Sequence, residues 1–211
     1  MARKIIKYGL LTLIVCLVAY KSVFIAKLSE LQSVEPKAFD APAYVAKLWD
    51  GRLPARLDSA ISLDALQTAM KSNAGAAFDT YFNSMSIGNI RYGLVKLTGK
   101  VTAVNDDDVT VVTGNSNEPL TVKIATEYVY GNAIRDASRL VDIKDFVNTQ
   151  DLNGISEELN KRIRNVVLPP FKSKVKKDDA IACVGAIELN EAHYSLNDLE
   201  IIPVQCKIIQ Q

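Results

Sequence analysis

An apolar run near the start of the chain limits what the rest of it can be. Residues 5–26 read IIKYGLLTLIVCLVAYKSVFIA, and their only charges are Lys7 and Lys21, one near each end. A helix of that length is about 33 Å long, enough to cross a hydrocarbon core of about 30 Å. The two lysines can extend to the headgroups, and Tyr8 and Tyr20 stand where interfacial aromatic residues belong. The run therefore predicts a membrane anchor over residues 1–28 and not a buried core helix.

The basic residues at the start of the chain set the orientation of this anchor. Arg3, Lys4 and Lys7 should stay in the cytoplasm by the positive-inside rule. We therefore expect a single-pass inner-membrane protein with a cytoplasmic N-terminus and a periplasmic C-terminal domain. Two alternatives stay open. A cleaved signal peptide needs small residues before the cut, and lipidation of Cys16 would have Val15 in place of the usual Gly, Ala or Ser.

The charge of the exported part argues against nucleic acid as a partner. The first thirty residues hold five of the 25 basic residues and one of the 24 acidic residues, so 20 basic and 23 acidic residues remain. Affinity for phosphate backbones comes mainly from Lys and Arg. The single histidine, His193, also removes most metal sites and most Ser-His or Cys-His nucleophile systems. We therefore expect no nucleic acid, no metal and no cofactor.

Between the anchor and residue 90 the sequence predicts a stalk and then helices. Residues 29–40 are polar and contain Pro36, as is typical of a short stalk. A helical collar follows at 41–90. Three helices are expected in it. The first is capped by Asp40 and ended by Gly51 and Pro54. The second covers 63–73, starts after Asp58 or Ser62 and is stopped by Gly75, and the third covers 76–82.

Beyond residue 93 the apolar residues alternate, as in half-buried strands. In LVKLTGKVTAV, residues 94–104, Val95, Leu97 and Val101 are apolar, whereas the even-numbered residues from 96 to 102 are polar. Further strands are expected at 109–113 and 120–124, a helix at 153–167 ended by Pro169 and Pro170, and strands at 180–189 and 199–209.

This order of elements predicts a fold class. Three strands, a helix and a final hairpin make up the OB-fold, a five-stranded barrel whose helix lies between strands three and four. We therefore expect a mainly β protein with added helices, in which residues 91–211 form an OB-like five-stranded barrel (strand-strand-strand-helix-strand-strand) with an insertion at 127–152. A generic small mixed sheet is the alternative.

The final hairpin predicts a disulfide between Cys183 and Cys206. In a hairpin with even arms these two residues face each other, because the midpoint between them falls in the loop EAHYSLN. Cys183 should share its face with Ile187, and Cys206 should share its face with Ile202, Val204 and Ile208, so that both cysteines point into the barrel. The alternative is two buried thiols, which a bulge at Pro203 would misalign.

The insertion carries residues that suggest a family. Gly131, Arg135 and Asp136 in YGNAIRDA, Phe146, Asn148 and Gln150 in FVNTQ, and Asn160 in EELN resemble the motif of a bacterial family of predicted periplasmic lipoproteins, domain of unknown function 2291. The likeness extends to YKSVFIAKL and FDAPAYVAKLWDGRLP, and so covers nearly the whole chain. The resemblance implies an extracytoplasmic OB-like domain, often encoded beside sugar uptake transporters of the ABC class, with no established activity.

Two groups of residues are candidates for binding. Arg135 and Asp136 could orient a sugar hydroxyl. Adjacent helical residues do not face each other, however, so we expect Asp136 to bind backbone N–H groups at a helix start and Arg135 to bind loop carbonyls, both in a structural role. The loops after strands one and four border the ligand face of an OB-fold. They predict a rim of Asp106, Asp107, Asp108, His193, Tyr194 and Asn197.

The same residues have simpler interpretations. Three consecutive aspartates are more typical of a solvated turn than of a calcium site, and the loop at His193 is typical of an exposed hairpin tip. A stripe of lysines could touch anionic lipid but is more typical of a solvated face. Its members are Lys172, Lys174, Lys176 and Lys177.

The sequence as a whole favours a binding function. We expect a membrane-anchored, extracytoplasmic, non-enzymatic module that binds a partner as an accessory to a sugar uptake transporter. Direct binding of a glycan or small solute is the alternative. A hydrolase is disfavoured because no nucleophile and base can be assembled from these residues. An exposed apolar patch would favour a protein partner, and a concave pocket of aromatic and amide side chains would favour a solute.

Overall fold

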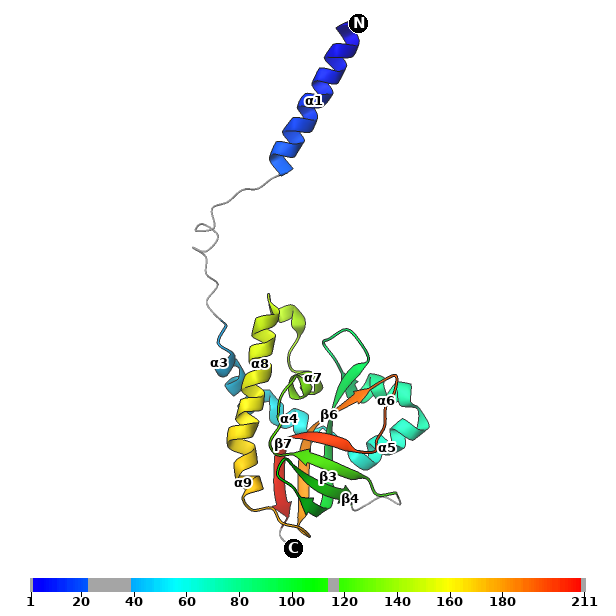
Figure 1. Cartoon of the computed structure of the whole chain (residues 1–211), viewed down its shortest axis with the longest axis vertical. Helices are drawn as coiled ribbons and strands as arrows, with labels where there is room; N and C mark the ends of the chain where they lie inside the picture. The colour runs from blue at the N-terminus through cyan, green and yellow to red at the C-terminus, as the bar shows by residue number, and fades with distance from the viewer. Residues whose placement is uncertain (1, 23–38, 114–117, 210–211) are drawn as a thin grey trace. The chain divides into compact units, whose positions relative to one another are not determined.

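The computed structural model describes residues 2–22, 39–113 and 118–209. Most of the expected stalk at 29–40, residues 23–28 of the expected anchor and part of the loop after residue 113 lie outside the described residues. The chain divides into two compact units, Met1–Phe39 and Asp40–Gln211, each of which is considered by itself (Figure 1).

The first unit contains the helix α1 (Ala2–Ser22). Its segment Lys4–Ser22 has a mean hydropathy of 1.6 and is long and apolar enough to cross a membrane. The apolar side chains along it, such as Leu11 and Val15, are exposed, and Cys16 is a free, exposed thiol. A membrane anchor and a signal sequence share this length and composition.

The second unit is built on a five-stranded barrel. Its strands are β3 (Ile90–Val104), β4 (Asp108–Thr113), β5 (Thr121–Ala125), β6 (Ala180–Asn190) and β7 (Leu199–Ile209). They pair in the order β3-β4-β5-β7-β6, and β6 pairs again with β3, so the sheet closes on itself. Among these pairs β5 and β7 run parallel and the others antiparallel. The predicted OB-like order is confirmed.

The barrel interior is filled by the apolar residues of its strands. Val95, Leu97 and Val101 of β3 are buried in one core cluster, whereas Lys96 and Lys100 are exposed, as the alternation predicts. Burial of one such aliphatic side chain contributes about 1.5 to 3 kcal/mol. Because side chains occupy the interior, a ligand has to bind on the outside of the barrel.

The helical collar completes the wall of this barrel. Two short strands that the sequence did not predict also pair with β3. The strand β1 (Ile61–Ser62) pairs with residues 95–96 of β3, and β2 (Phe82–Asn83) pairs with residues 92–93. The strand β4 pairs with β3 further along, at residues 99–104. The helices α5 (Leu63–Ser72) and α6 (Ala74–Tyr81) bury Leu66 and Phe78 in the same core cluster as the strands. Residues 41–90 therefore belong to the barrel unit and do not form a separate layer.

Two helices continue through residues that were expected to end them. The helices α3 (Ala41–Lys47) and α4 (Leu53–Asp58) are joined by the π-helical turn η1 (Leu48–Arg52). In the same way α8 (Thr149–Arg162) and α9 (Leu168–Lys172) are joined by η3 (Ile163–Val167). The predictions that Gly51 with Pro54, and Pro169 with Pro170, end their helices are wrong.

A wider turn before each proline explains this continuity. The N–H of Leu53 bonds to the carbonyl of Leu48, and that of Leu168 bonds to the carbonyl of Ile163, five residues back in both cases. The proline that follows lies in the first turn of the next α-helical segment, where its missing N–H is not needed.

One asparagine ends α5 and begins α6. The N–H of Asn73 bonds to the carbonyl of Ala69, and its Oδ1 accepts a hydrogen bond from the N–H of Ala76 at 3.1 Å. The predicted stop at Gly75 is therefore wrong, because the asparagine side chain caps the next helix first. The insertion after β5 contains α7 (Ala133–Ser138) and the 3-10 turn η2 (Ile143–Asp145).

A bulge in β7 sets the pairing of the last hairpin. Cys183 and Cys206 form a disulfide with their Cα atoms 4.2 Å apart. Gly185 pairs with Pro203, but Val184 pairs with Gln205, so the register shifts by one residue. Without this shift Cys183 would face Gln205 and the two cysteines would not meet. The expectation of even arms is therefore wrong, and the bulge aligns the two cysteines where it was expected to misalign them.

The same bulge reverses which residues of β7 face inward. Ile201 and Pro203 are buried before it, and Val204 is buried after it. Ile202 was expected to share the inward face of Cys206, and this is wrong. It lines a hollow on the outside of the barrel, because the extra residue changes the alternation.

We expect Gly185→Ala to lower the free energy of unfolding by about 1 to 3 kcal/mol. An added Cβ would lie 2.3 Å from the carbonyl oxygen of Ile202 and 2.6 Å from Cγ2 of Ile201. Gly75→Ala is the control, because its nearest contact would be at 3.6 Å and alanine favours a helix. Urea unfolding of both variants measures the difference, and equal stability would contradict this account of the close approach.

Candidate functional site

The insertion between β5 and α8 places a short helix inside the domain. The helix α7 follows a turn in which Gly131 has a φ of 78°, a left-handed conformation that glycine adopts without strain. Asn160 of α8 donates a hydrogen bond from Nδ2 to the carbonyl of Gly131 at 2.9 Å. All six residues of α7 are buried. Two residues of the family motif therefore hold the entry to α7.

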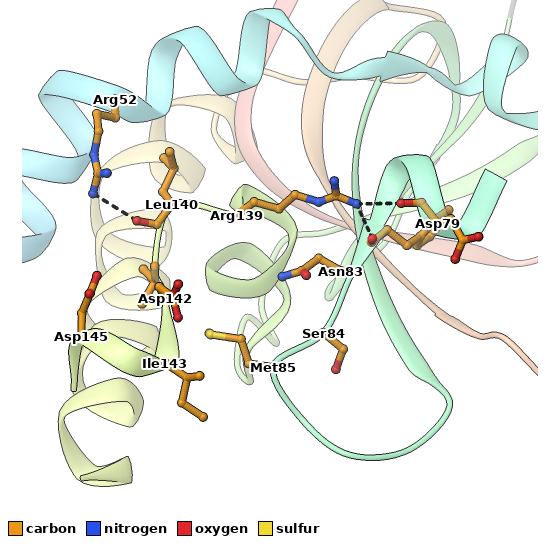
Figure 2. A pocket seen from close by; sticks show the side chains of 12 residues that line it. Arg52, Asp79, Asn83, Ser84, Met85, Arg139, Leu140, Asp142, Ile143 and Asp145 are labelled. Atoms are coloured by element: carbon orange, nitrogen blue, oxygen red, sulfur yellow. Dashed lines mark hydrogen bonds between the residues drawn. The ribbon is translucent and has the colours of Figure 1, made fainter. Parts of the chain in front are cut away.

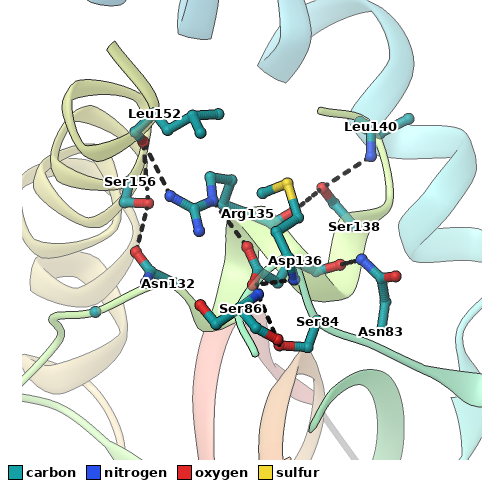
Figure 3. A network of polar contacts seen from close by, with 12 residues as sticks. Asn83, Ser84, Ser86, Asn132, Arg135, Asp136, Ser138, Leu140, Leu152 and Ser156 are labelled. Atoms are coloured by element: carbon teal, nitrogen blue, oxygen red, sulfur yellow. Dashed lines mark hydrogen bonds and ion pairs between the residues drawn. The ribbon is translucent and has the colours of Figure 1, made fainter. Parts of the chain in front are cut away.

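Helix α7 carries a buried ion pair between neighbouring residues. Arg135 Nε lies 2.8 Å from Oδ1 of Asp136, and the two side chains are 4% and 0% exposed (Figure 3). The expectation that they would not face each other is wrong. Both charges are removed from water, and a buried charge without a partner is costly, so the long arginine side chain turns back onto its neighbour.

The rest of this pair's hydrogen bonds tie α7 to two other segments. Asp136 Oδ2 accepts the backbone N–H of Met85 at 3.1 Å, and its carbonyl accepts Nδ2 of Asn83 at 2.9 Å. On the other side Nη1 of Arg135 donates to the carbonyl of Leu152 in α8 at 3.2 Å. The pair therefore fixes the segment after β2 and the start of α8 against one another.

Two adjoining hollows share Tyr130, Gly131 and Asn132 in their walls. The tyrosine hollow has a volume of about 380 Å³ and is also lined by Tyr92, Tyr128, Glu188, Asp198, Glu200 and Ile202. The amide hollow has a volume of about 310 Å³ and is also lined by Asn153, Ser156, Glu157, Asn160 and Arg164. We take the two hollows together as the candidate site.

Burial and like charges dominate the electrostatics of the tyrosine hollow. Tyr92 and Glu188 are direct partners on β3 and β6. Burial, together with the charge and hydrogen bond of Glu188, raises the pKa of Tyr92 to about 12. Burial and the charge of Asp108 raise the pKa of Glu200 on β7. Tyr92 is therefore a neutral hydroxyl at physiological pH, beside carboxylates that can accept hydrogen bonds.

Helix α8 and the π-helical turn η3 that continues it, which contains Arg164, hold the polar groups of the amide hollow in place. Oδ1 of Asn132 accepts a hydrogen bond from Oγ of Ser156 at 3.0 Å, which directs the amide nitrogen of Asn132 elsewhere (Figure 3). The guanidinium of Arg164 stacks 4.8 Å from the ring centre of Tyr130 and donates to the carbonyl of Val129. The shared wall is therefore fixed from the side of α8.

This arrangement matches the chemistry of a ligand rich in hydroxyl groups. Tyr128 and Tyr130 are 65% and 64% exposed and present aromatic faces at the rim. Carboxylates and amides beside such faces can accept and donate hydrogen bonds to sugar hydroxyls. Each volume lies near the lower end of the range of about 300 to 1,000 Å³ that is typical of small-molecule sites.

The other motif residues lie outside the hollows and have local roles. Phe146 packs edge-on against Tyr44 at 5.7 Å between ring centres. Asn148 caps α8 by accepting the N–H of Asp151 at 2.9 Å. Gln150 lies exposed in the first turn of α8.

The expected rim residues lie on two sides of the barrel. The turn at Asp106–Asp108 lies beside α9, since Nζ of Lys172 donates to the carbonyl of Asp106 at 2.8 Å. In the loop after β6, Tyr194 packs against Phe78 of α6 at 5.6 Å. In Figure 1, α9 and α6 lie on opposite sides of the barrel. His193 and Asn197 lie in that same loop, and no rim residue lines either hollow. The rim stays a prediction.

Sequence reasoning missed the tyrosines and carboxylates that line the site. Tyr128 and Tyr130 stand two residues apart in EYVYG, an alternation that could have indicated a common face. Glu188 and Glu200 interrupt the apolar runs of the last two strands at outward positions. What brings them together is the pairing of β6 with β3 and β7, which no local pattern encodes.

No metal centre is evident in the part of the chain that the structure describes. Within residues 2–22, 39–113 and 118–209 no group of three His, Cys, Asp or Glu side chains is placed to hold a metal ion.

Comparisons with known proteins bear on the family and the fold. The model of a family described as predicted periplasmic lipoprotein, DUF2291, matches residues 13–207. No curated protein matches the chain.

Among solved structures, the chain is similar to an OB-fold protein from Thermotoga maritima, with 21% identity and a TM-score of 0.70, over 82% of this chain and 100% of that one. Two other matches have much lower TM-scores and do not bear on the fold. A replication protein A heterotrimer bound to ssDNA gives 0.25 at 8% identity over 56% and 59% of the two chains, and the S. pombe Stn1-Ten1 complex gives 0.26 at 12% over 61% and 71%. The first likeness supports the OB-like fold.

We expect Asp136→Asn to lower the free energy of unfolding by about 3 to 5 kcal/mol, because it leaves the buried Arg135 without its counter-charge. Thermal or urea unfolding measures the loss. Asp178→Asn is the matched control, since Asp178 pairs with Lys100 on the exposed surface and asparagine tolerates its left-handed backbone. A variant as stable as the parent that lost ligand binding would show that Asp136 acts on a ligand and not on the fold.

Proposed function

The chain belongs to the DUF2291 family of predicted periplasmic lipoproteins, and we propose that it is a membrane-tethered, non-enzymatic module that binds a glycan or a sugar-like solute outside the cytoplasm. The observation that carries this proposal is the pair of adjoining hollows lined by tyrosine, amide and carboxylate side chains. Such a lining is what distinguishes a solute site from a surface that binds only another protein.

The two hollows together favour more than one sugar ring. They share the wall of Tyr130, Gly131 and Asn132, so a ligand that crosses this wall reaches both groups of polar side chains. The carboxylates of Glu188, Asp198 and Glu200 disfavour an acidic glycan. A neutral or amino-substituted oligosaccharide therefore fits best.

A second candidate function is docking to a component of a sugar uptake transporter. Ile87 and Val147 are fully exposed, and each stands on a loop and lines neither hollow. Burial of an exposed aliphatic side chain against a partner protein is favourable, so these two positions can contribute to such a contact. The two functions are compatible, since a tethered module that binds sugar could present it to a transporter.

The position of the single histidine supports the proposal that this module is not an enzyme. His193 lies in the loop after β6, outside both hollows, and its backbone N–H donates to the carbonyl of Asn190. A nucleophile in the hollows would therefore lack this residue as its base.

We expect full-length protein to remain in inner membranes after carbonate washing and to begin with Met1 or Ala2. The apolar segment Lys4–Ser22 and the basic residues at its start support an uncleaved anchor with the domain outside the cytoplasm. Mass spectrometry of the purified chain identifies its first residue. A chain that begins at an acylated Cys16 would establish lipoprotein processing in place of the anchor.

We expect full-length protein in detergent to bind neutral oligosaccharides of glucose or galactose more tightly than uronic-acid oligomers of equal length, measured by calorimetry. Tyr128→Ala should weaken this binding about tenfold, the equivalent of about 1.4 kcal/mol, because an exposed aromatic face is lost. Glu188→Gln should also weaken it.

Tyr81→Ala is the matched control, since Tyr81 is an exposed tyrosine of α6 that lines neither hollow. It should bind like the parent. If Tyr128→Ala and Glu188→Gln both bound the oligosaccharides as well as the parent does, the hollows would not be the site.

A further inference from the structure

A third and larger hollow, the polar cavity, lies on the other side of the buried ion pair. Its volume is about 740 Å³. Asn83 and Met85, which Asp136 holds by hydrogen bonds, are part of its wall. The cavity is therefore built on the same network as the candidate site but shares no residue with the two hollows.

Charges of both signs stand on each side of this cavity. Figure 2 shows Arg52 with Asp142 and Asp145 on one side, and Arg139 with Asp79 on the other. Each side thus offers a guanidinium and at least one carboxylate. A ligand that carries groups of one sign only would meet repulsion at both ends.

The two guanidiniums are held in place by backbone carbonyls. Nη2 of Arg52 donates to the carbonyl of Leu140 at 3.1 Å, and Nη2 of Arg139 donates to the carbonyls of Phe82 and Asp79. A guanidinium has five N–H donors, so these bonds leave donors for a ligand. Partial burial and the charge of Arg56 lower the pKa of Arg139, which remains a cation because its usual pKa is so high.

Arg139 also has a backbone conformation that is uncommon for its type. Its φ is 54°, in the left-handed region, and it follows directly on α7. That conformation costs free energy in a residue with a Cβ, and the surrounding contacts have to maintain it. Its position beside a cavity agrees with a role in binding.

The walls between the charged ends combine aliphatic side chains with the polar side chains of Asn83 and Ser84. Met85, Leu140, Val141 and Ile143 line the cavity, and its one aromatic residue, Phe82, is buried. Sugars bind against exposed aromatic faces, which the tyrosine hollow has and this cavity lacks. Aliphatic and thioether side chains, in contrast, accommodate varied side chains of a peptide.

We infer that the polar cavity binds a short peptide segment with a free carboxylate at one end and a cationic group toward the other. The guanidinium of Arg52 pairs with the carboxylate, and Asp79 on the other side of the cavity accepts the amine or a basic side chain. Ile87 follows Met85 by two residues, and Val147 follows Ile143 by four. Both are fully exposed, so the peptide can belong to a larger protein that contacts these loops.

The test uses full-length protein in detergent and a fluorescent tetrapeptide library with free C-termini, followed by fluorescence polarisation. We expect micromolar binding of zwitterionic members. Amidation of the C-terminus and Arg52→Gln should each weaken it at least tenfold, and Asp79→Asn should weaken it for peptides with a basic residue.

Arg91→Gln is the matched control, since Arg91 pairs with Glu191 outside the cavity, and it should bind like the parent. Thermal unfolding checks that each variant is folded, and oligosaccharide binding should be unchanged in Arg52→Gln because the two sites share no residue. The inference is overturned if no tetrapeptide binds the parent, or if binding survives amidation and both cavity variants unchanged.

Discussion

The structure outside the barrel depends on one requirement, that the buried charges of Arg135 and Asp136 be satisfied. Each is almost fully removed from water, and each makes a further hydrogen bond to a different segment, the loop after β2 or the start of α8. Breaking the pair would leave a charge in a medium that solvates it poorly. The helix α7 is therefore fixed between two walls, and one wall faces each of the two proposed sites.

The barrel itself depends on close approach between strands. At Gly99 and Gly185 a Cβ would lie 2.5 Å and 2.3 Å from the carbonyl oxygens of Val112 and Ile202, so only glycine allows these strands to bend and close. Closure fills the interior with apolar side chains. The candidate site then lies on the insertion and on outward residues of β3, β6 and β7, in agreement with the general rule that function resides in segments carried by a rigid scaffold.

The two proposed sites differ in the ligand chemistry that they favour. The tyrosine and amide hollows present aromatic faces with carboxylates and amides, whereas the polar cavity presents ions of both signs at its sides and has no exposed aromatic face. The helix α7 lies between them, and the hydrogen bonds of Asp136 and Arg135 hold a wall on each side of it in place. A sugar-binding site and a peptide-binding site on one tethered module would suit a protein that works beside a transporter.

Sequence patterns alone determined the apolar N-terminal helix, the five strands and their order, and the family, because period, turn residues and motif spacing are local. They also singled out Cys183 and Cys206 as candidate partners. They did not determine which residues meet across the barrel. The bulge at Val204 aligned the cysteines and turned Ile202 outward, the π turns carried two helices through prolines, and the pairing of β6 with β3 and β7 brought Tyr92, Glu188 and Glu200 together. These outcomes follow from closing one sheet around one core. That constraint acts between residues far apart in the chain, and for this reason only the tertiary structure decided them.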